Sequence, residues 1–319
     1  MKIRTLVIAI TLLIYSTGNG QSEKRTQILI LQSYDHHDSE FQAYTFEKIL
    51  HQTGNYHIDK IVGTEEKFWY DQEINFKDYD LIVSSGLGHD NIPMDIASKL
   101  EQYIKEGGNM VLVHQGVTSF ASQNWPVFQK IIGFGWYGSA SGTHTYWDDS
   151  TKTWIETPRF HGVAPAHGKQ HEFVVQVRDT EHPITKGIPL EWMHGMDEFY
   201  HGMRGSKENV EILATAFSDI NMWGSGRHEP IAWTSKYGAG RVFVTVLGHV
   251  FQEKYADGVP GINSFENKNL AIHCVGFQSL FARGVEWAAT GSVSIGFPWN
   301  FPTKEKSKSV DPSEIVWKK

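Results

Sequence analysis

The chain has 319 residues, of which 40% are hydrophobic and 20% are charged, and this composition excludes a disordered chain. The formal net charge of -7 at pH 7 argues against binding to nucleic acid or to an anionic membrane surface, because both need concentrated Lys and Arg. We therefore expect a small-molecule or oligosaccharide substrate as the partner. Assembly into a homo-oligomer stays open.

The first twenty residues have the pattern of a secretory signal peptide. Lys2 and Arg4 precede an apolar run over residues 5–15, and small residues follow as far as Gly20. This order is typical of a signal peptide, and the run is too short for a membrane-spanning helix. The sequence therefore predicts cleavage near Gly20 and a periplasmic or secreted protein without a membrane anchor. One cysteine, Cys274, is then left, so no intramolecular disulfide can form.

The first half of the mature chain alternates short apolar runs with segments of helical periodicity. Buried strands are predicted at 28–31, 57–62, 81–83 and 110–113, and helices over 41–50 and 96–104. Strands that alternate with helices form a parallel sheet that is covered on both faces, which makes the strands nearly continuous in hydrophobicity. We therefore predict an α/β fold with a doubly wound, mostly parallel sheet.

The middle of the chain loses this periodicity. Residues 125–170 are rich in Gly, Pro, His and aromatic residues, and we expect a long functional loop there, because disordered segments contain little Trp and Tyr. Four aromatic side chains of this loop either form a platform for a sugar ring or pack in the loop interior: Trp136, Tyr137, Tyr146 and Trp147. The sequence does not decide the role of the segment from Phe134 to His171.

Strands resume in the last third of the chain. They are predicted at 173–177, 210–213, 230–233 and 241–247, and an amphipathic helix over 270–285 closes the domain. Residues 292–319 contain three prolines and a Lys-rich run, so we expect a C-terminal extension on the surface.

Histidines follow several of the predicted strands. His36 and His37 come after the first strand, His114 after the fourth and His249 after the strand at 241–247. Ligands of open α/β sheets bind beside the carboxyl ends of the strands, so we expect these histidines to converge on one site. A single histidine in such a place is more often structural, but four in equivalent places favour a functional site.

Two adjacent carboxylates stand in the segment from Met196 to Arg204. If Asp197 and Glu198 are both buried, their repulsion could leave one protonated as an acid, while the other orients an imidazole or a sugar hydroxyl. The alternative is an ordinary strand in which Arg204 neutralises a carboxylate.

No cofactor is specified by a motif. His167 and His171 would share one face of a helix, but Pro165 and Gly168 favour a loop, so a divalent metal would need histidines from separate loops. The chain has neither a complete dinucleotide-binding glycine motif nor the Gly-x-Ser-x-Gly turn of many serine hydrolases.

A set of motifs resembles, in order, the ThuA-like (trehalose utilisation) family. The matching segments are 107–114, 179–184, 197–200, 240–249 and 287–291. Each motif is weak alone, but the ordered set is specific, and it extends over a single domain at 26–291.

The resemblance implies the flavodoxin-like, three-layer fold of class I glutamine amidotransferases. Those enzymes carry a nucleophilic cysteine in a sharp turn after a central strand, and His114 stands at that turn here. Cys274 falls in the predicted C-terminal helix, where a small apolar role is expected. The resemblance thus implies a protein that is not a glutamine amidotransferase and that transfers protons rather than acyl groups.

The family name implies carbohydrate catabolism, and the family resembles proteins encoded beside oxidoreductases that make 3-keto glycosides. An enzyme that acts on such a sugar, as a lyase, isomerase or hydrolase, needs a base and an acid. The candidate catalytic residues are His37, His114, Asp197, Glu198 and His249. The candidate substrate-binding residues are His36, Gln115, His167, His171, Tyr200 and Arg204. Two alternatives stay open, a non-catalytic glycan-binding module and a metal-dependent hydrolase with histidine ligands.

Overall fold

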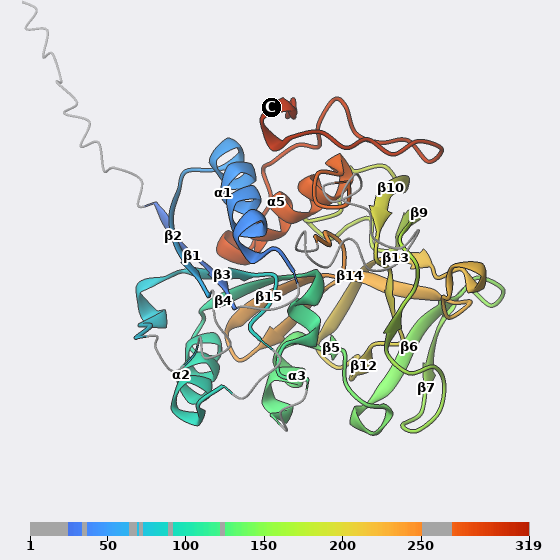
Figure 1. Cartoon of the computed structure of the whole chain (residues 1–319), viewed down its shortest axis with the longest axis horizontal. Helices are drawn as coiled ribbons and strands as arrows, with labels where there is room; N and C mark the ends of the chain where they lie inside the picture. Colours follow the sequence, from blue (N-terminus) through green and yellow to red (C-terminus); the bar gives the residue numbers. More distant parts are fainter. Residues whose placement is uncertain are drawn as a thin grey trace, which may run out of the picture.

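The computed structural model describes residues 25–33, 37–63, 69, 73–88, 92–121, 125–250 and 270–318 (Figure 1). The predicted signal peptide and the candidate residue His36 lie outside these ranges. Within them, no helix combines the length and the apolar character needed to cross a membrane.

A parallel sheet forms the centre of the fold, as the sequence predicts. Its strands lie in the order β2-β1-β3-β4-β15, and every neighbouring pair is parallel. Their bounds are β1 (Thr26–Gln32), β2 (Tyr56–Val62), β3 (Leu81–Ser84), β4 (Asn109–Val113) and β15 (Gly240–Thr245). All residues of β3 and β4 are buried, which is why these strands are continuously apolar.

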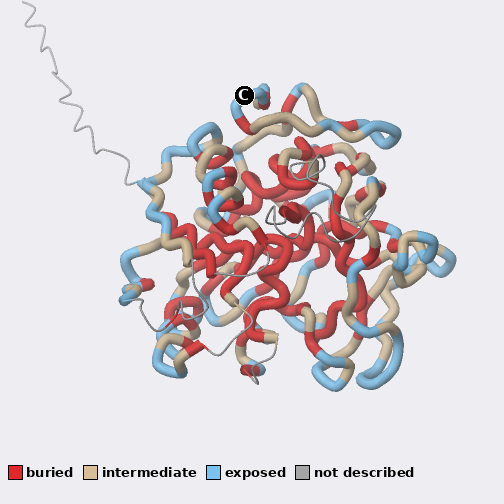
Figure 2. The backbone as a smooth tube through the Cα atoms, viewed as in Figure 1, coloured by how far each residue is buried: buried red, intermediate tan, exposed pale blue. Residues whose placement is uncertain are grey.

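Helices cover both faces of this sheet and make three layers. One face carries α1 (Ser39–Thr53) and α5 (Val275–Thr290), and the other carries α2 (Met94–Lys105) and α3 (Pro126–Ile132) (Figure 1). The buried part of the chain runs through the sheet and the inner sides of the helices (Figure 2). Short 3-10 helices connect the elements: η2 (Phe76–Asp78), η3 (His114–Thr118), η4 (Ser139–Ser141), η5 (Ile220–Met222) and η7 (Pro312–Glu314).

Beyond β15 the sheet continues with antiparallel strands. The order is β15-β14-β13-β9-β10, and each strand runs against its neighbour. The bounds are β14 (His228–Tyr237), β13 (Val210–Phe217), β9 (His171–Val177) and β10 (Glu191–Asp197). Four reversals restore the original direction, so β10 ends at the same edge as the parallel strands.

The prediction of a long loop over 125–170 is wrong. The segment contains α3, β5 (Phe134–Gly135), β6 (Thr143–Asp148), β7 (Thr153–Thr157) and β8 (Ala166–His167). β6 and β7 form a hairpin, while β12 (Arg204–Gly205) pairs with β5 and β6, and β11 (Tyr200–His201) pairs with β8. Thr, His and Trp alternate in the hairpin strands, so no aliphatic run marks them.

The C-terminal residues pack back onto the domain. Ser309 forms a β-bridge with Cys274, and the Met193 amide donates to the Thr303 carbonyl at 2.7 Å. Cys274 itself caps the start of α5, so the prediction that it lies inside the helix is wrong by one residue. The residues around Cys274 pair with the C-terminal segment, through the Val275 amide to the Lys308 carbonyl and the Val310 amide to the His273 carbonyl, and the helix begins at Val275.

An ion pair between Lys48 of α1 and Asp311 of the tail predicts a pH-dependent stability. Burial disfavours the Asp311 carboxylate, but its hydrogen bonds with Lys48 (2.7 Å) and Ser313 outweigh burial and lower its pKa to about 2. Because the folded-state pKa lies below the ordinary value of 3.8, this contribution is full above about pH 4 and is lost as the pH falls to about 2.

We expect Asp311→Asn to remove this component, about 1 kcal/mol for a partly exposed pair, from the acid-induced loss of stability. Urea unfolding at several pH values between about 5 and 2 measures it. Asp95→Asn is the matched control, because Asp95 forms an exposed ion pair with Lys99 at 3.8 Å. A variant that loses as much stability as the parent over this range would contradict the prediction.

Candidate functional site

Four buried side chains from distant segments converge at the carboxyl edge of the sheet. They are His37, His114, Glu198 and His249, here called the His-Glu cluster, and one potential ligand atom from each lies within 4.8 Å of the others. The imidazole centroids are 5.3 Å apart for His37 and His114, 5.1 Å for His37 and His249, and 4.9 Å for His114 and His249. Three of the four histidines that the sequence predicts to converge therefore do so, and the fourth, His36, lies outside the described residues.

His37 occupies the turn between β1 and α1. Asp38 next to it caps α1, because its carboxylate accepts the Phe41 amide at 3.0 Å. The Asp38 amide donates to the Val250 carbonyl at 3.1 Å. This bond ties the turn that carries His37 to the segment that carries His249.

His114 follows β4 in a strained turn. Its φ of 46° lies in the left-handed region, which costs a non-glycine residue about 1–2 kcal/mol. Its Nδ1 lies 2.8 Å from the Val246 carbonyl oxygen and must donate to it, because a carbonyl only accepts. In the neutral ring Nε2 then carries a lone pair, and this atom faces Glu198. Strain of this kind is concentrated at functional sites.

His249 is placed by the glycine before it. Gly248 has a φ of 96°, and a Cβ at this position would lie 2.7 Å from the Phe277 ring. The Gln170 side-chain amide lies 3.0 Å from His249 Nδ1 and orients the imidazole. Burial, followed by the neighbouring histidines, lowers the pKa of His249 well below its usual value. The ring is therefore neutral at physiological pH.

Asp197 lies behind the cluster and holds its parts. Its carboxylate, which is fully buried, accepts the amides of Glu198 (2.7 Å), Gly248 (2.8 Å) and His249 (3.3 Å). It also bonds to His194 Nε2 at 2.7 Å. Burial opposes its ionisation, but His194 outweighs burial and keeps the Asp197 pKa below its usual value. Both oxygens of Asp197 are therefore occupied by hydrogen bonds that hold the backbone of Glu198, Gly248 and His249 and the side chain of His194 in place.

A Cys-His-Asp array extends from Asp197 into the core. Burial lowers the pKa of His194, but the Cys274 sulfur and the Asp197 carboxylate outweigh it and raise that pKa to about 9. The Cys274 sulfur also accepts the Gly195 amide at 3.4 Å. Cys274, His194 and Asp197 are each 0% exposed, so this thiol does not meet a substrate. Sequence reasoning missed His194, whose only signal is its place three residues before Asp197.

The Glu198 carboxylate has two different surroundings. Its Oε2 lies 3.7 Å from His114 Nε2 and 3.8 Å from His249 Nε2. Its Oε1 lies 3.1 Å from His167 Nδ1, but without hydrogen-bond alignment, because that nitrogen also faces the Gly168 carbonyl. Within the described chain, Oε1 therefore has no hydrogen-bond partner although it is buried. The His167 side chain is 46% exposed and connects Glu198 with the surface.

Two predicted substrate-binding residues border the cluster. The Tyr200 ring lies 4.2 Å from the His114 ring, and Gln115 is buried in η3 directly after His114. Trp136 packs edge-on against Tyr200 at 5.0 Å and lies 6.1 Å from the His167 ring. An aromatic wall thus stands beside the cluster.

Most of the other predicted aromatic and histidine candidates have packing partners elsewhere. Tyr137 is buried, Tyr146 lies under Arg227, and Trp147 packs against Trp154 at 5.2 Å. His171 begins β9, where its Nδ1 contacts the Lys169 carbonyl at 2.7 Å. These contacts give the three aromatic residues structural roles in and around the β6–β7 hairpin.

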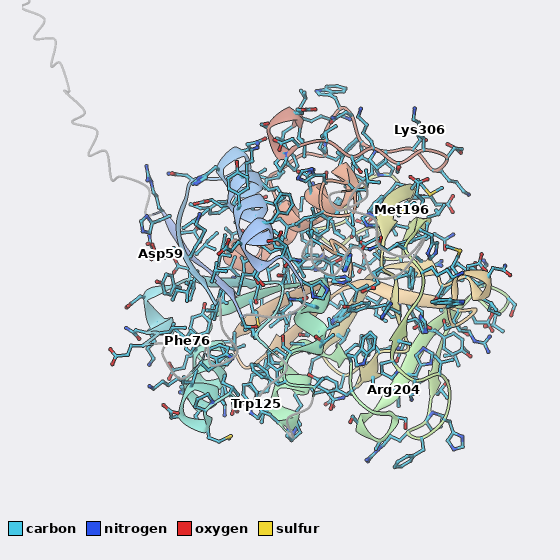
Figure 3. All side chains as sticks on the ribbon, viewed as in Figure 1. Asp59, Phe76, Trp125, Met196, Arg204 and Lys306 are labelled. Atoms are coloured by element: carbon cyan, nitrogen blue, oxygen red, sulfur yellow. The ribbon has the colours of Figure 1, made fainter. Side chains whose placement is uncertain are left out.

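Arg204 belongs to a second buried network. It donates to the His161 carbonyl at 2.8 Å. Burial lowers the pKa of Arg204, and the nearby charge of Glu229 only partly offsets this. Glu229 pairs directly with His144 at 2.9 Å. Figure 3 shows Arg204 well separated from Met196, at the other end of the same segment. The structure thus does not bring Arg204 into the His-Glu cluster.

Comparisons with known proteins agree on one family. The model of the trehalose utilisation family, ThuA, matches residues 27–259. A protein from Parabacteroides merdae ATCC 43184 described as ThuA-like is similar in structure, with a TM-score of 0.79 and 33% identity over 91% of this chain and 99% of that one. A second such protein, from Bacteroides uniformis ATCC 8492, shares the fold with a TM-score of 0.50 and 19% identity over 84% and 94%. No curated protein matched.

The strain at His114 predicts that glycine is a better replacement than alanine. Both substitutions remove the ring, but only alanine keeps a Cβ in the left-handed conformation. We expect His114→Gly to unfold with a free energy about 1 kcal/mol higher than that of His114→Ala. Denaturant unfolding of the two variants measures the difference, and equal stabilities would show that the turn is unstrained.

Removal of the Asp197 carboxylate should leave several buried donors without an acceptor. We expect Asp197→Ala to lower the free energy of unfolding by about 3–5 kcal/mol. Asp219→Ala is the control, because Asp219 caps η5 at the surface, where a lost cap costs about 1 kcal/mol. Thermal and urea unfolding measure both losses, and similar values would argue against the role of Asp197.

Proposed function

This chain belongs to the ThuA family, and we propose that it is an exported enzyme of carbohydrate catabolism that acts on an oxidised, 3-keto glycoside. The family description supports the metabolic context. The buried His-Glu cluster is the observation that carries the proposal. Four polar side chains gathered in a core lower the stability of the fold, and ionisable groups in such surroundings are concentrated at functional sites. The signal-like residues 1–20 support export.

The proposed reaction is an elimination that needs only proton transfer. The ketone at C3 acidifies the hydrogen on C2, and a base removes this hydrogen as a proton. The electron pair of the C–H bond forms an enolate, whose negative charge lies on the ketone oxygen. The enolate then collapses to a C1–C2 double bond, the C1–O bond breaks, and an acid protonates the leaving oxygen. No oxidant or reductant is consumed.

Glu198 has the geometry of the base in this reaction. Its Oε1 is the buried oxygen without a hydrogen-bond partner within the described chain, and the His167 side chain beside it is partly exposed to solvent. The opposite oxygen lies 3.7 Å from His114 Nε2 and 3.8 Å from His249 Nε2, so both imidazoles stand beside the proposed base. Asp197 is a positioning residue, because it contacts the backbone of Glu198 and His249.

Trp136 supplies a surface for a sugar ring. It is only partly buried, and the buried Tyr200 supports it beside the cluster. Stacking of a sugar on an aromatic face would hold C2 near Glu198. The same surface also supports the alternative of a glycan-binding module without catalysis.

The test is turnover of a panel of 3-keto glycosides, followed by mass spectrometry. We expect Glu198→Gln to lower the rate by about 10²–10⁴-fold, which is the usual contribution of a general base. Glu211→Gln is the control, because Glu211 is exposed and lies outside the cluster.

Export is tested by the N-terminus of the protein. Protein recovered from the periplasm or medium should begin after Gly20.

Two results would overturn the proposal. If no member of the panel yields a product while sugars bind equally to the parent and to Glu198→Gln, the protein is a glycan-binding module. If the full-length chain stays in the cytoplasm with its first residues intact, export is wrong.

A further inference from the structure

The spacing of the His-Glu cluster fits an ion between its members. Glu198 Oε2 lies 3.7 Å from His114 Nε2 and 3.8 Å from His249 Nε2. Both distances are too long for a hydrogen bond, which ends near 3.2 Å. Both are shorter than twice a zinc–nitrogen or zinc–oxygen bond of about 2.0–2.2 Å, so one ion can touch both atoms of each pair. The widest separation in the set, 4.8 Å, needs a side-chain movement of less than about 1 Å.

Two buried atoms of the cluster also lack hydrogen-bond partners among the described residues. His114 Nδ1 lies against the Val246 carbonyl, so Nε2 is the ring nitrogen that faces Glu198. Within the described chain, His114 Nε2 and Glu198 Oε1 are buried and have no hydrogen-bond partner. A buried polar atom without a partner costs stability. A metal ion held between the histidines and the carboxylate would supply that partner.

We propose that His37, His114, His249 and Glu198 bind one divalent transition-metal ion, with zinc as the ion that best fits three imidazoles and one carboxylate. Zinc accepts nitrogen and oxygen ligands in a four-coordinate site. Calcium and magnesium prefer oxygen ligands and fit a set of three imidazoles poorly.

The surroundings of the four side chains resemble the outer shell of a metal site. Ligand histidines usually donate their second ring nitrogen to a carbonyl or carboxylate, as His114 does to Val246. Asp197 fixes the backbone of Glu198 and His249. The Gln170 side-chain amide lies 3.0 Å from His249 Nδ1. With its oxygen turned toward this nitrogen it would accept the Nδ1 hydrogen, and His249 Nε2 would bind the ion.

The ion deepens the proposed function, on which its catalytic role rests. The ketone oxygen of the sugar would join the four protein ligands as a fifth, and the ion would stabilise the negative charge of the enolate, as metal ions do at developing oxyanions. Glu198 would bind the ion through Oε2 and remove the C2 proton with Oε1. The two oxygens already have these different surroundings.

The experiment measures metal without any sugar. The full-length protein is dialysed against a chelator, reloaded with zinc, desalted and analysed for metal by mass spectrometry. We expect about one zinc per chain and a higher melting temperature in the loaded protein. Cobalt in place of zinc should give the visible absorption of a four-coordinate site.

Matched variants locate the ion. His114→Gln and Glu198→Gln should lose the bound zinc, and Gln170→Ala should weaken it by about 10–100-fold, as outer-shell changes do. His144→Gln is the buried control, because His144 contacts Glu229 directly at 2.9 Å in another network, and His57→Gln is the exposed control. Circular dichroism checks the folding of every variant, and the isosteric Glu198→Gln serves if His114→Gln does not fold.

Each result decides the inference. A folded parent that retains no zinc, or Glu198→Gln and His114→Gln variants that retain it like the controls, would overturn it. Turnover of a 3-keto glycoside by chelator-treated protein at the full rate would refute the metal but keep the proposed function. Zinc bound in the cluster without turnover on any sugar would keep the metal and refute the proposed reaction.

Discussion

The buried carboxylate of Asp197 is the interaction on which the rest of the site depends. It accepts the backbone amides of the two segments that carry Glu198 and His249, and it is charged because His194 balances it. A buried carboxylate with this many donors cannot move without a large cost. Its bonds therefore set the distance between the end of β10 and the segment after β15. Backbone hydrogen bonds to Asp197 thus position the residues that carry the Glu198 and His249 side chains.

This interaction requires a particular sheet topology. β10 reaches the carboxyl edge of the parallel strands only because four antiparallel pairings lie between it and β15. With three or five pairings the end of β10 would lie at the opposite edge, and Glu198 could not meet the histidines. The antiparallel extension thus adds a carboxylate to a site that the parallel core alone would supply with histidines.

Histidine and cysteine side chains occupy different places around the site. His114 occupies the strained turn after β4, where its Nε2 faces Glu198. Cys274 is enclosed beside His194 at the start of α5. Burial raises the pKa of its thiol, but His194 outweighs burial and holds that pKa below the usual value. The thiol is thus part of the support behind the site, and the imidazoles form the cluster itself.

The sequence alone determined the parallel core and the places of its histidines. Aliphatic runs such as the one in β4 leave few alternatives, because a strand buried on both faces must be apolar throughout, and His37, His114 and His249 follow such runs. Tertiary structure alone decided the rest. The β6–β7 hairpin has no aliphatic run, and the different tasks of Asp197 and Glu198 depend on segments more than fifty residues away. Arg204 lies away from the cluster because it pairs with β5 in β12 and donates to the His161 carbonyl. Strand pairing and side-chain direction are properties of the folded chain, so the local sequence around Arg204 does not show them.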